Sequence, residues 1–410
     1  MNDVLALILA GGLGQRMGIL CDSRPKPMLP FACRYSIIDF TLSNCIHSGI
    51  KDIAVLVDHQ RQLMSHYVSH WQHINSVGIG LQTLEPQSGS YRGTADAIYQ
   101  NIDLLRRLSP EITIVLAGDH VYRMDYREML TLHKKAGADV TIGAVSVPVK
   151  QAHRFGIIKL DNCDRVIDFV EKPLRPNGNL ASMGIYLFNT DFLIQYLIKD
   201  STDPYSKHDF GRTLIPDMVH HNKVFAYQFR DYWQDIGTVD AYYGANMELV
   251  RNMPPVSLNG HWPIMTNDYN VRPPMLVNSF SIRNSLIGEG CIVEGEVENS
   301  ILFPNVTVKE HSSVRNSIVM SRTVIDSYTT VDHAVLDENV ILGQFCYIGY
   351  VDVPIQKEKG VTVLGKGAVV PDYTAIRSNS RTTGGSQATV SVTCPVPCRV
   401  RRLDKEEIIS

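Results

Sequence analysis

The segment Val4-Leu-Ala-Leu-Ile-Leu-Ala-Gly-Gly-Leu-Gly-Gln-Arg16 joins a short apolar run to a glycine-rich turn and a cation. The run Val4–Ala10 is apolar throughout, which predicts a strand buried on both faces, as in a parallel sheet. The glycines after it would let backbone N–H groups approach phosphate oxygens at the carboxyl end of that strand. The spacing fits neither a P-loop nor the dinucleotide fingerprint, which disfavours P-loop kinases, ATPases and nicotinamide folds. A bare Gly-Gly-x-Gly is equally compatible with a structural turn.

Similar apolar runs recur further along the chain, at Ile53–Val57 and Ile112–Ala117. Between the runs lie stretches with helical spacing of apolar residues, such as Ile37–His47 and Thr94–Leu108. This alternation over the first 250 residues predicts an α/β domain with a doubly wound, mostly parallel sheet. In such a domain, ligands bind at the carboxyl ends of the strands.

The last third of the chain contains an internal repeat with spacings of 15, 17 and 17 residues. The four copies are Ile282-Arg-Asn-Ser-Leu286, Val297-Glu-Asn-Ser-Ile301, Val314-Arg-Asn-Ser-Ile318 and Val331-Asp-His-Ala-Val335. Small apolar residues about six apart, with glycine at corners, match hexapeptide repeats and predict a left-handed parallel β-helix. An antiparallel sandwich would also give short strands, but not aligned copies of one phrase.

These patterns divide the chain into four parts. We expect an α/β domain over 1–253, a proline-rich linker over 254–275, the β-helix over 276–376 and a tail over 377–410. The linker should pack on the first domain, because Trp262 and Tyr269 would be costly to leave in water.

Composition excludes several classes of function. The 410 residues carry 39 Lys and Arg against 42 Asp and Glu, a net charge of −3, so no basic surface for nucleic acid or an anionic membrane is expected. No apolar run approaches about 18 residues, which argues against a membrane span. The N-terminus does not resemble a signal peptide. The eight cysteines are scattered, which is typical of reduced thiols in a cytoplasmic protein.

Two groups of charged residues suggest phosphate chemistry. Arg16, Arg24 and Lys26 follow the glycine-rich turn, and the prolines of Arg24-Pro-Lys-Pro27 restrict the backbone that holds the lysine. Asp119 follows a buried strand and Asp235 lies between apolar neighbours. Together the two carboxylates could hold one Mg²⁺ that bridges phosphates. Taken separately, the basic segment could be a solvated surface, and each aspartate could be a cap or turn residue.

In a series of short sequence phrases, the chain resembles the bacterial ADP-glucose pyrophosphorylases (glucose-1-phosphate adenylyltransferases), within the wider sugar nucleotidylyltransferases. The matching phrases run in order through the first 265 residues: Leu9-Ala-Gly-Gly-x-Gly-x-Arg16, Arg24-Pro-Lys-Pro27, Ile37-Ile-Asp-Phe-Thr-Leu-Ser-Asn-Cys45, Tyr91-Arg-Gly-Thr-Ala-Asp-Ala97, Leu116-Ala-Gly-Asp-His120, Phe155-Gly156, Glu171-Lys-Pro173, Ser182-Met-Gly-Ile-Tyr186, His208-Asp-Phe-Gly211 and Tyr232-Trp-x-Asp-x-Gly-Thr238.

The resemblance implies roles for individual residues. Arg16, Lys26 and Asp119 would be the catalytic set, and Asp119 and Asp235 would bind Mg²⁺. The ATP site would contain Gly11, Gly12, Gly14, Gln87, Gly93 and Thr94. The glucose 1-phosphate site would contain Tyr91, Gly156, Glu171, Lys172, Ser182, Tyr186 and Asp209.

The implied reaction joins ATP and glucose 1-phosphate into ADP-glucose and pyrophosphate, the glucosyl donor for glycogen synthesis. A phosphate nucleophile is already ionised, so the sequence need offer no nucleophile–His–Asp triad. Two alternatives stay open: another nucleoside triphosphate or sugar phosphate, and a non-catalytic regulatory homologue. Retention of the phosphate-binding cations and Asp119 argues against the second.

The resemblance also implies a homotetramer and a small-molecule allosteric effector that binds near the junction of the two domains. Here, however, Ser23 and Ser36 stand where a phosphorylated effector would require cations. We therefore expect weak or absent activation by fructose 1,6-bisphosphate.

Overall fold

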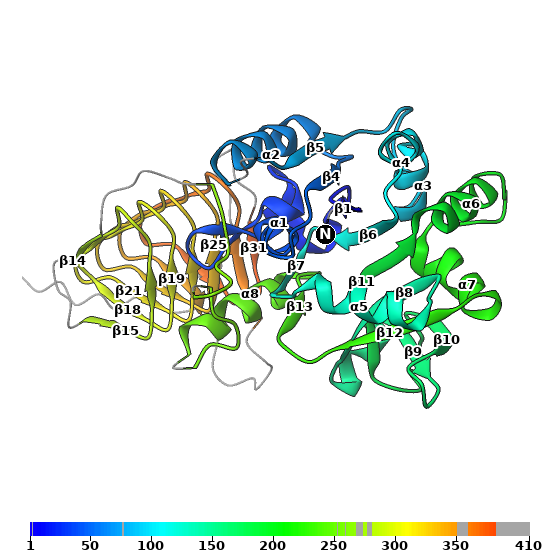
Figure 1. Ribbon diagram of the computed structural model, residues 1–410. Coiled ribbons are helices and arrows are strands. Elements are labelled where there is room, and N and C mark those ends of the chain that lie inside the picture. Colours follow the sequence, from blue (N-terminus) through cyan, green and yellow to red (C-terminus); the bar gives the residue numbers. More distant parts are fainter. Residues whose placement is uncertain are drawn as a thin grey trace, which may run out of the picture.

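The computed structural model describes residues 1, 3–75, 78–251, 253–258, 260–267, 274–276, 281–350 and 360–382. Two parts lie side by side (Figure 1): an α/β domain formed by the first 250 residues and a β-helix formed by the last third of the described chain. This confirms the predicted fold class.

The α/β domain is built on a nine-stranded mixed sheet. Its parallel half has the order β6 (Ile112–Ala117), β1 (Val4–Leu9), β4 (Asp52–Leu56) and β5 (Gly80–Leu84). The other half is arranged around β11 (Leu180–Asn189), which runs antiparallel to β6, β8 (Val140–Ser146) and β9 (Gly156–Leu160). At the edges, β10 (Val166–Glu171) pairs with β9, and β12 (Val224–Phe229) runs parallel to β8.

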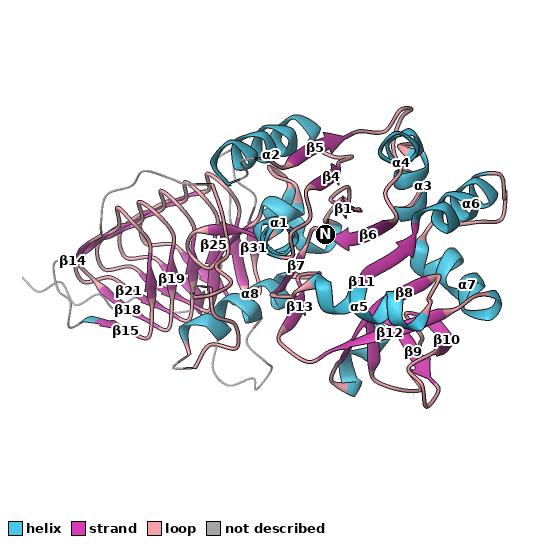
Figure 2. Ribbon diagram, in the orientation of Figure 1, coloured by secondary structure: helices cyan, strands magenta, loops and turns pink. Residues whose placement is uncertain are grey.

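Helices cover both faces of this sheet (Figure 2). Alternate residues of β1 belong to different cores: Ala6 and Ile8 pack with one group of helices, and Leu5 and Leu7 pack with another. The first group contains α1 (Ile38–His47), α2 (Arg61–Asn75) and α5 (Tyr126–Ala136). The second contains α3 (Thr94–Tyr99), α4 (Ile102–Leu108), α6 (Thr190–Ser201) and α7 (Ile215–His221). Burial on both faces explains why the strands are apolar throughout.

One predicted helix is divided in two. The stretch Thr94–Leu108 forms α3 and α4, and the break falls at Gln100 and Asn101. The Asn101 amide donates to the Ala97 carbonyl (2.9 Å) and to the Tyr91 hydroxyl (3.0 Å). Such side-chain bonds to nearby groups compete with the helical pattern, and apolar spacing alone does not reveal them.

The β-helix contains three parallel six-stranded sheets. The first holds β14 (Met275–Leu276), β17 (Ile292–Val293), β20 (Thr307–Val308), β23 (Val324–Ile325), β26 (Ile341–Leu342) and β29 (Val369–Val370). The second holds β15 (Ile282–Arg283), β18 (Glu296–Glu298), β21 (Ser313–Arg315), β24 (Thr330–Asp332), β27 (Tyr347–Tyr350) and β30 (Ala375–Arg377). The third holds β16 (Leu286–Ile287), β19 (Ile301–Leu302), β22 (Ile318–Val319), β25 (Ala334–Leu336), β28 (Thr362–Leu364) and β31 (Arg381–Thr382). Arg381 and Thr382 belong to the expected tail, for which a terminal strand was one of two open alternatives, and they form the last strand of the third sheet.

The repeated phrase sets the register of the rungs. Ile282 pairs with Val297, Val297 with Val314, and Val314 with Val331, as the four aligned copies predict. The Asn of three copies and the His of the fourth lie at one corner with positive φ, between 44° and 55°. Asparagine tolerates this left-handed conformation better than most residues, which explains its recurrence.

The two parts share one apolar core. Phe31 and Ile236 of the α/β domain pack in the same cluster as Ile301, Ile318 and Val335 of the third sheet. The helix α8 (Val239–Met247), the 3-10 turns η1 (Gln15–Cys21) and η5 (Glu248–Val250), and the hairpin β2 (Pro30–Phe31) and β3 (Tyr35–Ser36) contribute to this contact. The β-helix is therefore packed against the segments that follow the glycine-rich turn.

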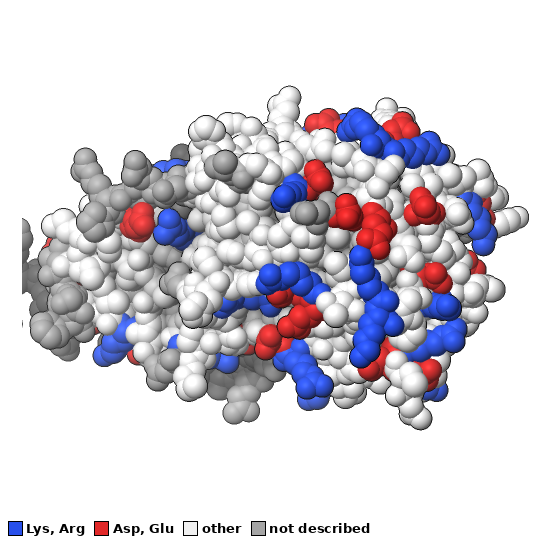
Figure 3. Space-filling model, viewed as in Figure 1, with Lys and Arg blue, Asp and Glu red and all other residues white. Residues whose placement is uncertain are grey.

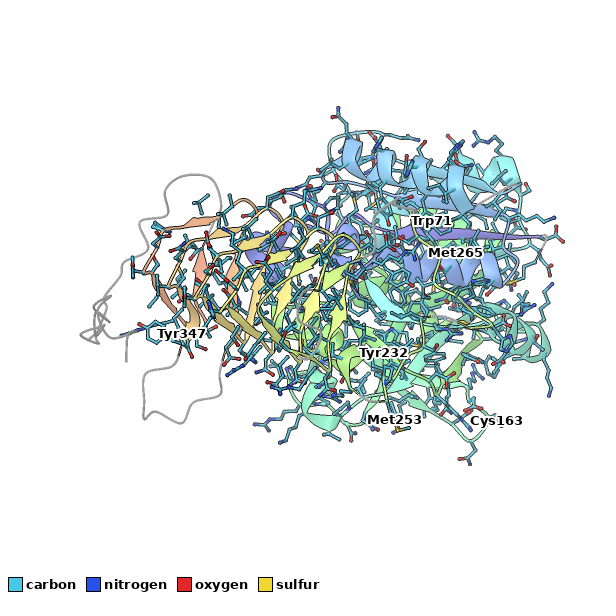
Figure 4. All side chains as sticks on the ribbon, turned by 90° about the vertical axis from the view of Figure 1, so that its left-hand side faces the viewer. Trp71, Cys163, Tyr232, Met253, Met265 and Tyr347 are labelled. Atoms are coloured by element: carbon cyan, nitrogen blue, oxygen red, sulfur yellow. The ribbon has the colours of Figure 1, made fainter. Side chains whose placement is uncertain are left out.

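The described part of the linker lies on α1, as expected. Trp262 donates from its indole N–H to Oδ1 of Asn44 (3.0 Å), and the backbone N–H of Met265 donates to Oγ of Ser43 (2.8 Å). Met265 also packs against the core that contains Trp71; both are labelled in Figure 4. Tyr269 lies outside the described residues.

On the face shown in Figure 3, basic and acidic side chains are interspersed over the α/β domain. Within the described ranges, no helix combines the length and the apolar character that a membrane span requires.

Candidate active site

The glycine-rich turn lies at the carboxyl end of β1 and leads into η1. Gly14 has φ 64°, and a Cβ there would stand 2.9 Å from Sγ of Cys21, so this position requires glycine. At Gly11 a Cβ would come within 3.1 Å of the Asp58 side chain. Around Gly12, by contrast, no heavy atom of the described residues other than Gly12 itself and its two chain neighbours lies within 4 Å of where a Cβ would stand. The space above Gly12 is open, which suits close approach of a ligand to the backbone.

Lys26 joins the two predicted metal ligands. It opens the 3-10 turn η2 (Lys26–Met28) and is 8% exposed. Its Nζ donates to Oδ2 of Asp119 and lies 3.9 Å from Oδ1 of Asp235. Burial disfavours ionisation of Asp119, but Lys26 and His120 outweigh it and hold the pKa of that carboxyl well below its usual range. The Asp119 carboxyl is therefore ionised at neutral pH.

A small second sheet brings the aspartates together. The strand β7 (His120–Tyr122) follows Asp119 directly and pairs antiparallel with β13 (Trp233–Asp235), with Asp235 opposite His120. The backbone N–H of Ile236 donates to the Asp119 carbonyl (3.3 Å). Two segments more than a hundred residues apart thus present their carboxylates to one lysine.

Two further residues at this site were not identified from the sequence. Nε2 of His120 lies 3.6 Å from Oδ1 of Asp119 and 3.9 Å from Oδ1 of Asp235, and Nη2 of Arg154 lies 3.6 Å from Oδ2 of Asp235. Nδ1 of His120 and Nη2 of Arg154 are buried and lack hydrogen-bond partners among the described residues. Arg154 ends the turn η3 (Val149–Arg154) and directly precedes the phrase Phe155-Gly156. Its position next to that phrase was the one sequence signal that could have identified it.

Arg16 is exposed beside this group. A Cβ built on Gly237 would stand 3.3 Å from Nη2 of Arg16 and 2.8 Å from Oδ2 of Asp235. Glycine at 237 therefore lets the guanidinium and the carboxylate approach the same stretch of backbone.

The donor set fits a hard divalent cation. Asp119 and Asp235 offer carboxylate oxygens, the ligands that Mg²⁺ prefers, and both already face a shared positive charge, the ammonium of Lys26. Among the described residues, no group of three or more His, Cys, Asp or Glu is arranged to hold a metal. A magnesium ion here would therefore complete its shell with water and substrate phosphates, as is usual for this ion.

Glu171 stands at the centre of the second predicted subsite. Its carboxylate lies between two glycines: a Cβ at Gly156 or at Gly211 would come within 2.8 Å of Oε2. Lys172 Nζ lies 2.8 Å from Oε1 of Glu171 and is half exposed. Lys172 also has φ 46°, an unusual conformation for a residue with a long side chain. Such local strain is typical of functional sites.

The other residues of this subsite come from β11 and from η4 (Phe210–Leu214), a π-helical turn. A register shift between Ser182 and Tyr186 interrupts the pairing of β11 with β8. Tyr186 is buried, stacks on Phe210 at 5.7 Å, and its hydroxyl accepts from Oγ of Ser182 at 3.4 Å. Burial, with Glu171 and Asp209 nearby, raises the pKa of Tyr186 well above its ordinary value. Tyr186 is therefore a neutral hydrogen-bonding group between two carboxylates.

Asp209 caps η4 and is tied to α3. It accepts from the backbone N–H of Arg212 (3.0 Å) and from the Thr94 hydroxyl (3.1 Å), while the Thr94 hydroxyl accepts from the N–H of Phe210 (3.0 Å). Gly93 is required by this contact, because a Cβ there would lie 2.3 Å from the His208 carbonyl oxygen. The structure thus places Gly93 and Thr94, expected at the nucleotide, next to the predicted sugar residue Asp209.

Tyr91 and Gln87 lie elsewhere along this edge. The ring of Tyr91, expected at the sugar, lies beside Gly11, and its backbone N–H donates to Oδ2 of Asp58 (3.3 Å). The Gln87 side chain is exposed, and its backbone N–H donates to Oε1 of Gln100 (3.0 Å).

Trp233 connects the two subsites. Its ring contacts His120 at 5.1 Å and Phe155 at 5.4 Å, and the Phe155 carbonyl accepts the N–H of Lys172 (3.1 Å). In addition, a Cβ at Gly184, in the irregular part of β11, would stand 3.6 Å from the His120 ring. The lysine–aspartate group and the Glu171 group are therefore neighbours in the structure.

Comparison with known proteins agrees with this architecture. A family model described as nucleotidyl transferase matches residues 5–252, and one described as GlmU-like, C-terminal hexapeptide, matches residues 277–371. The fold and the site thus define a nucleotidyl transferase that carries a hexapeptide β-helix.

Relatives that match most of this chain narrow the class of nucleotidyl transferase to one family. A glucose-1-phosphate adenylyltransferase of Fervidobacterium nodosum is 40% identical over 394 residues, which cover 92% of this chain and 95% of that protein. Proteins of the same name from Acetivibrio thermocellus and Methylococcus capsulatus are 38% and 41% identical and cover 92% and 84% of this chain, and 92% and 89% of their own lengths. The chain belongs to the glucose-1-phosphate adenylyltransferase family.

Proposed function

We propose that this protein converts ATP and α-D-glucose 1-phosphate into ADP-glucose and pyrophosphate, and so supplies the glucosyl donor for glycogen synthesis. The observation that carries the proposal is the position of Lys26. It contacts Asp119 and Asp235, and its side chain lies beside Gly14 of the glycine-rich turn. Trp233 connects this group to Phe155, whose carbonyl accepts the N–H of Lys172. A triphosphate and a sugar phosphate would meet between these two lysines.

The chemistry is in-line attack of a sugar phosphate oxygen on the α-phosphorus of ATP. The nucleophile is an anion already, so the residues must align two anions and neutralise charge on the leaving pyrophosphate. Lys26 and Arg16 would bind the triphosphate over Gly11, Gly12 and Gly14, and Nη2 of Arg154, which lacks a hydrogen-bond partner among the described residues, would donate to a phosphate oxygen. A magnesium ion held by Asp119 and Asp235 would neutralise phosphate charge when bound.

The second substrate would bind around Glu171. Lys172 would hold its phosphate, while Glu171, Ser182, Tyr186 and Asp209 would accept or donate hydrogen bonds to sugar hydroxyls. Gly156 leaves room for the Glu171 carboxylate. Thr94 and Gly93 would then support the sugar subsite through Asp209, and Tyr91 would contact the nucleotide side.

A substrate matrix tests the proposal. Pyrophosphate release is measured with ATP, GTP, UTP and dTTP, each paired with several sugar 1-phosphates, with and without Mg²⁺. ATP with glucose 1-phosphate should be the preferred pair and should require the metal. Preference for another triphosphate by more than tenfold would select the alternative of a different nucleotidylyltransferase, and inactivity in all pairs would select a non-catalytic homologue.

We also propose that the protein assembles into a homotetramer through the β-helix. Ile292, Ile341 and Val369 of its first sheet and Tyr347 of its second (labelled in Figure 4) are 39% to 54% exposed, and Ile341 and Val369 are paired on neighbouring strands, so apolar side chains are available there for contact with another copy. Light scattering tests this directly: the mass of one chain, 45.9 kDa, would refute assembly.

A small-molecule effector would bind between the domains. A cavity of about 710 Å³ lies at the junction, and both Ser23 and Ser36 line it together with Arg24, Arg34, Arg322, Lys366, Glu289 and Glu338. The cations suit an anionic effector. Two of them, Arg24 and Lys366, are already paired with Glu338.

A further inference from the structure

A buried ion pair joins the two parts of the protein. Arg24 is 5% exposed, and its Nη2 lies 2.7 Å from Oδ1 of Asp337 and 3.2 Å from Oε2 of Glu338. Asp337 is fully buried and directly follows β25 in the third sheet of the β-helix. The sheet that packs on the α/β domain therefore holds a guanidinium from that domain.

The packing of the β-helix does not by itself require an aspartate at position 337. Its backbone N–H donates to the next rung as those of Phe303 and Met320 do, so the three residues occupy the same position on successive rungs. Phe303 and Met320 are buried apolar residues, and the position accommodates them without a charge. Asp337 is a carboxylate there, with one oxygen, Oδ2, buried without a hydrogen-bond partner among the described residues. Buried carboxylates are costly unless they are paired, and its pair is Arg24.

Arg24 is rigidly connected to Lys26. Pro25 separates them with φ −60° and ψ 143°, and Pro27 follows. The Cα atoms of Arg24 and Lys26 can be at most about 7 Å apart, because two residues of extended chain span no more. The two prolines also restrict the backbone conformations of this segment. The N–H groups of Met28 and Leu29 donate to the carbonyls of Pro25 (2.9 Å) and Lys26 (3.0 Å), which closes the turn. A displacement of Arg24 is therefore passed on to Lys26.

We propose that Asp337, assisted by Glu338, is a positioning residue for Lys26 and acts through Arg24. Asp337 and Glu338 hold the guanidinium on the β-helix side, and the proline-bounded turn fixes the ammonium of Lys26 between Asp119 and Asp235 on the other. The proposal rests on the proposed function of Lys26, and it makes the β-helix a structural component of the active site.

The test is Asp337→Asn in the full-length protein, with Asp326→Asn as the matched control. The two aspartates make the same local bond, because Oδ1 of each accepts the next backbone N–H (2.6 Å at Asp337 and 2.7 Å at Asp326). The partners of Asp326, however, are Lys309 and Ser327 of the β-helix. Asp337→Asn should lower kcat roughly 10-fold to 100-fold, the scale of a small misplacement of a catalytic group. Asp326→Asn should leave kcat within about twofold.

Two measurements separate positioning from general destabilisation. Hydrogen exchange at the Met28 and Leu29 amides should accelerate in Asp337→Asn and not in Asp326→Asn, at a temperature where both variants are folded. In a Lys26→Ala background, Asp337→Asn should lower the residual kcat less than about twofold, because residues that act through one another are not additive.

Parental kcat in Asp337→Asn, unchanged exchange at these amides, or an equal loss of kcat with and without Lys26 would each overturn the proposal. Failure of the proposed function has a different signature. The parent would then make no ADP-glucose, or Lys26→Ala would match the parent, while the exchange comparison would still report whether Asp337 holds this turn.

Discussion

Asp235 lies directly opposite His120 in the two-stranded ladder of β7 and β13, and this pairing places its carboxylate within 3.9 Å of the Lys26 ammonium that Asp119 also contacts. A shift of one residue in this ladder would turn Asp235 to the other face. The register of three residue pairs therefore determines whether one carboxylate or two face Lys26.

Asp119→Asn should reduce turnover at least about 100-fold, the scale typical of removing one strong electrostatic contributor. The substitution keeps the shape of the side chain and removes the charge that faces Lys26. Steady-state pyrophosphate release measures the effect. Asp103→Asn, at an exposed position in the first turn of α4, is the control and should behave like the parent. A near-parental rate in Asp119→Asn would remove this residue from the metal site.

The two lysines should affect different substrates. Lys172→Ala should raise KM for glucose 1-phosphate far more than KM for ATP, because Lys172 pairs with Glu171 in the proposed sugar phosphate subsite. Lys26→Ala should act on ATP binding and on kcat, because Lys26 faces both aspartates. Full kinetic surfaces over both substrates separate the two effects. If both variants changed both KM values equally, the two subsites would be misassigned.

The buried Asp39 should make the protein less stable as the pH rises from about 4 to about 6. Burial raises the pKa of Asp39 to about 6, although hydrogen bonds from the Tyr67 hydroxyl (2.6 Å) and the Ser36 N–H (2.8 Å) act to lower it. In the unfolded chain an aspartate has a pKa of about 3.9. Between these values the folded state binds more protons than the unfolded state, so the free energy of unfolding falls with rising pH, by on the order of 3 kcal/mol in total.

Urea unfolding of the parent and of Asp39→Asn across this range checks the sign. The free energy of unfolding of the parent, minus that of the variant, should decrease as the pH rises. A difference that is constant or increases with pH contradicts the prediction.

Fructose 1,6-bisphosphate should activate the protein less than about tenfold at submillimolar concentration, because its binding depends on charge-assisted contacts. The junction cavity presents Ser23 and Ser36, and it commits Arg24 and Lys366 to carboxylates. Initial rates with and without the bisphosphate measure the response. Stronger activation would direct attention to Arg34 and Arg322, which also line the cavity.

The sequence predicted the parts of the fold that depend on local periodicity. The apolar run at Ile112–Ala117 matches β6, and the repeated phrase fixes the register of the β-helix, since Val297, Val314 and Val331 lie in one column. The antiparallel half of the sheet was not predicted, because strand direction depends on connections that periodicity does not encode.

The sequence paired Asp119 with Asp235 as expected ligands of one Mg²⁺, but it did not show how the two segments meet. Their carboxylates come together at Lys26 through the pairing of β7 with β13. His120 and Arg154 were missed because a histidine and an arginine carry no distinctive spacing. Tyr91 and Thr94 were assigned to subsites by resemblance alone, and side-chain contacts then placed them beside Gly11 and Asp209.

The separation of Arg24 from Asp337 by 313 positions along the chain has a consequence for biosynthesis. Translation at about 5 to 20 residues per second leaves on the order of 15 to 60 s between the emergence of the arginine and that of its partner. During this interval the nascent α/β domain carries an unpaired guanidinium, and the apolar surface that later meets the β-helix is uncovered. A chain that ends after the α/β domain but before Asp337 would therefore carry Lys26, Asp119 and Asp235, with Arg24 still unpaired. The fourth strand of the third sheet thus leads to the partner of an arginine that was made at the start.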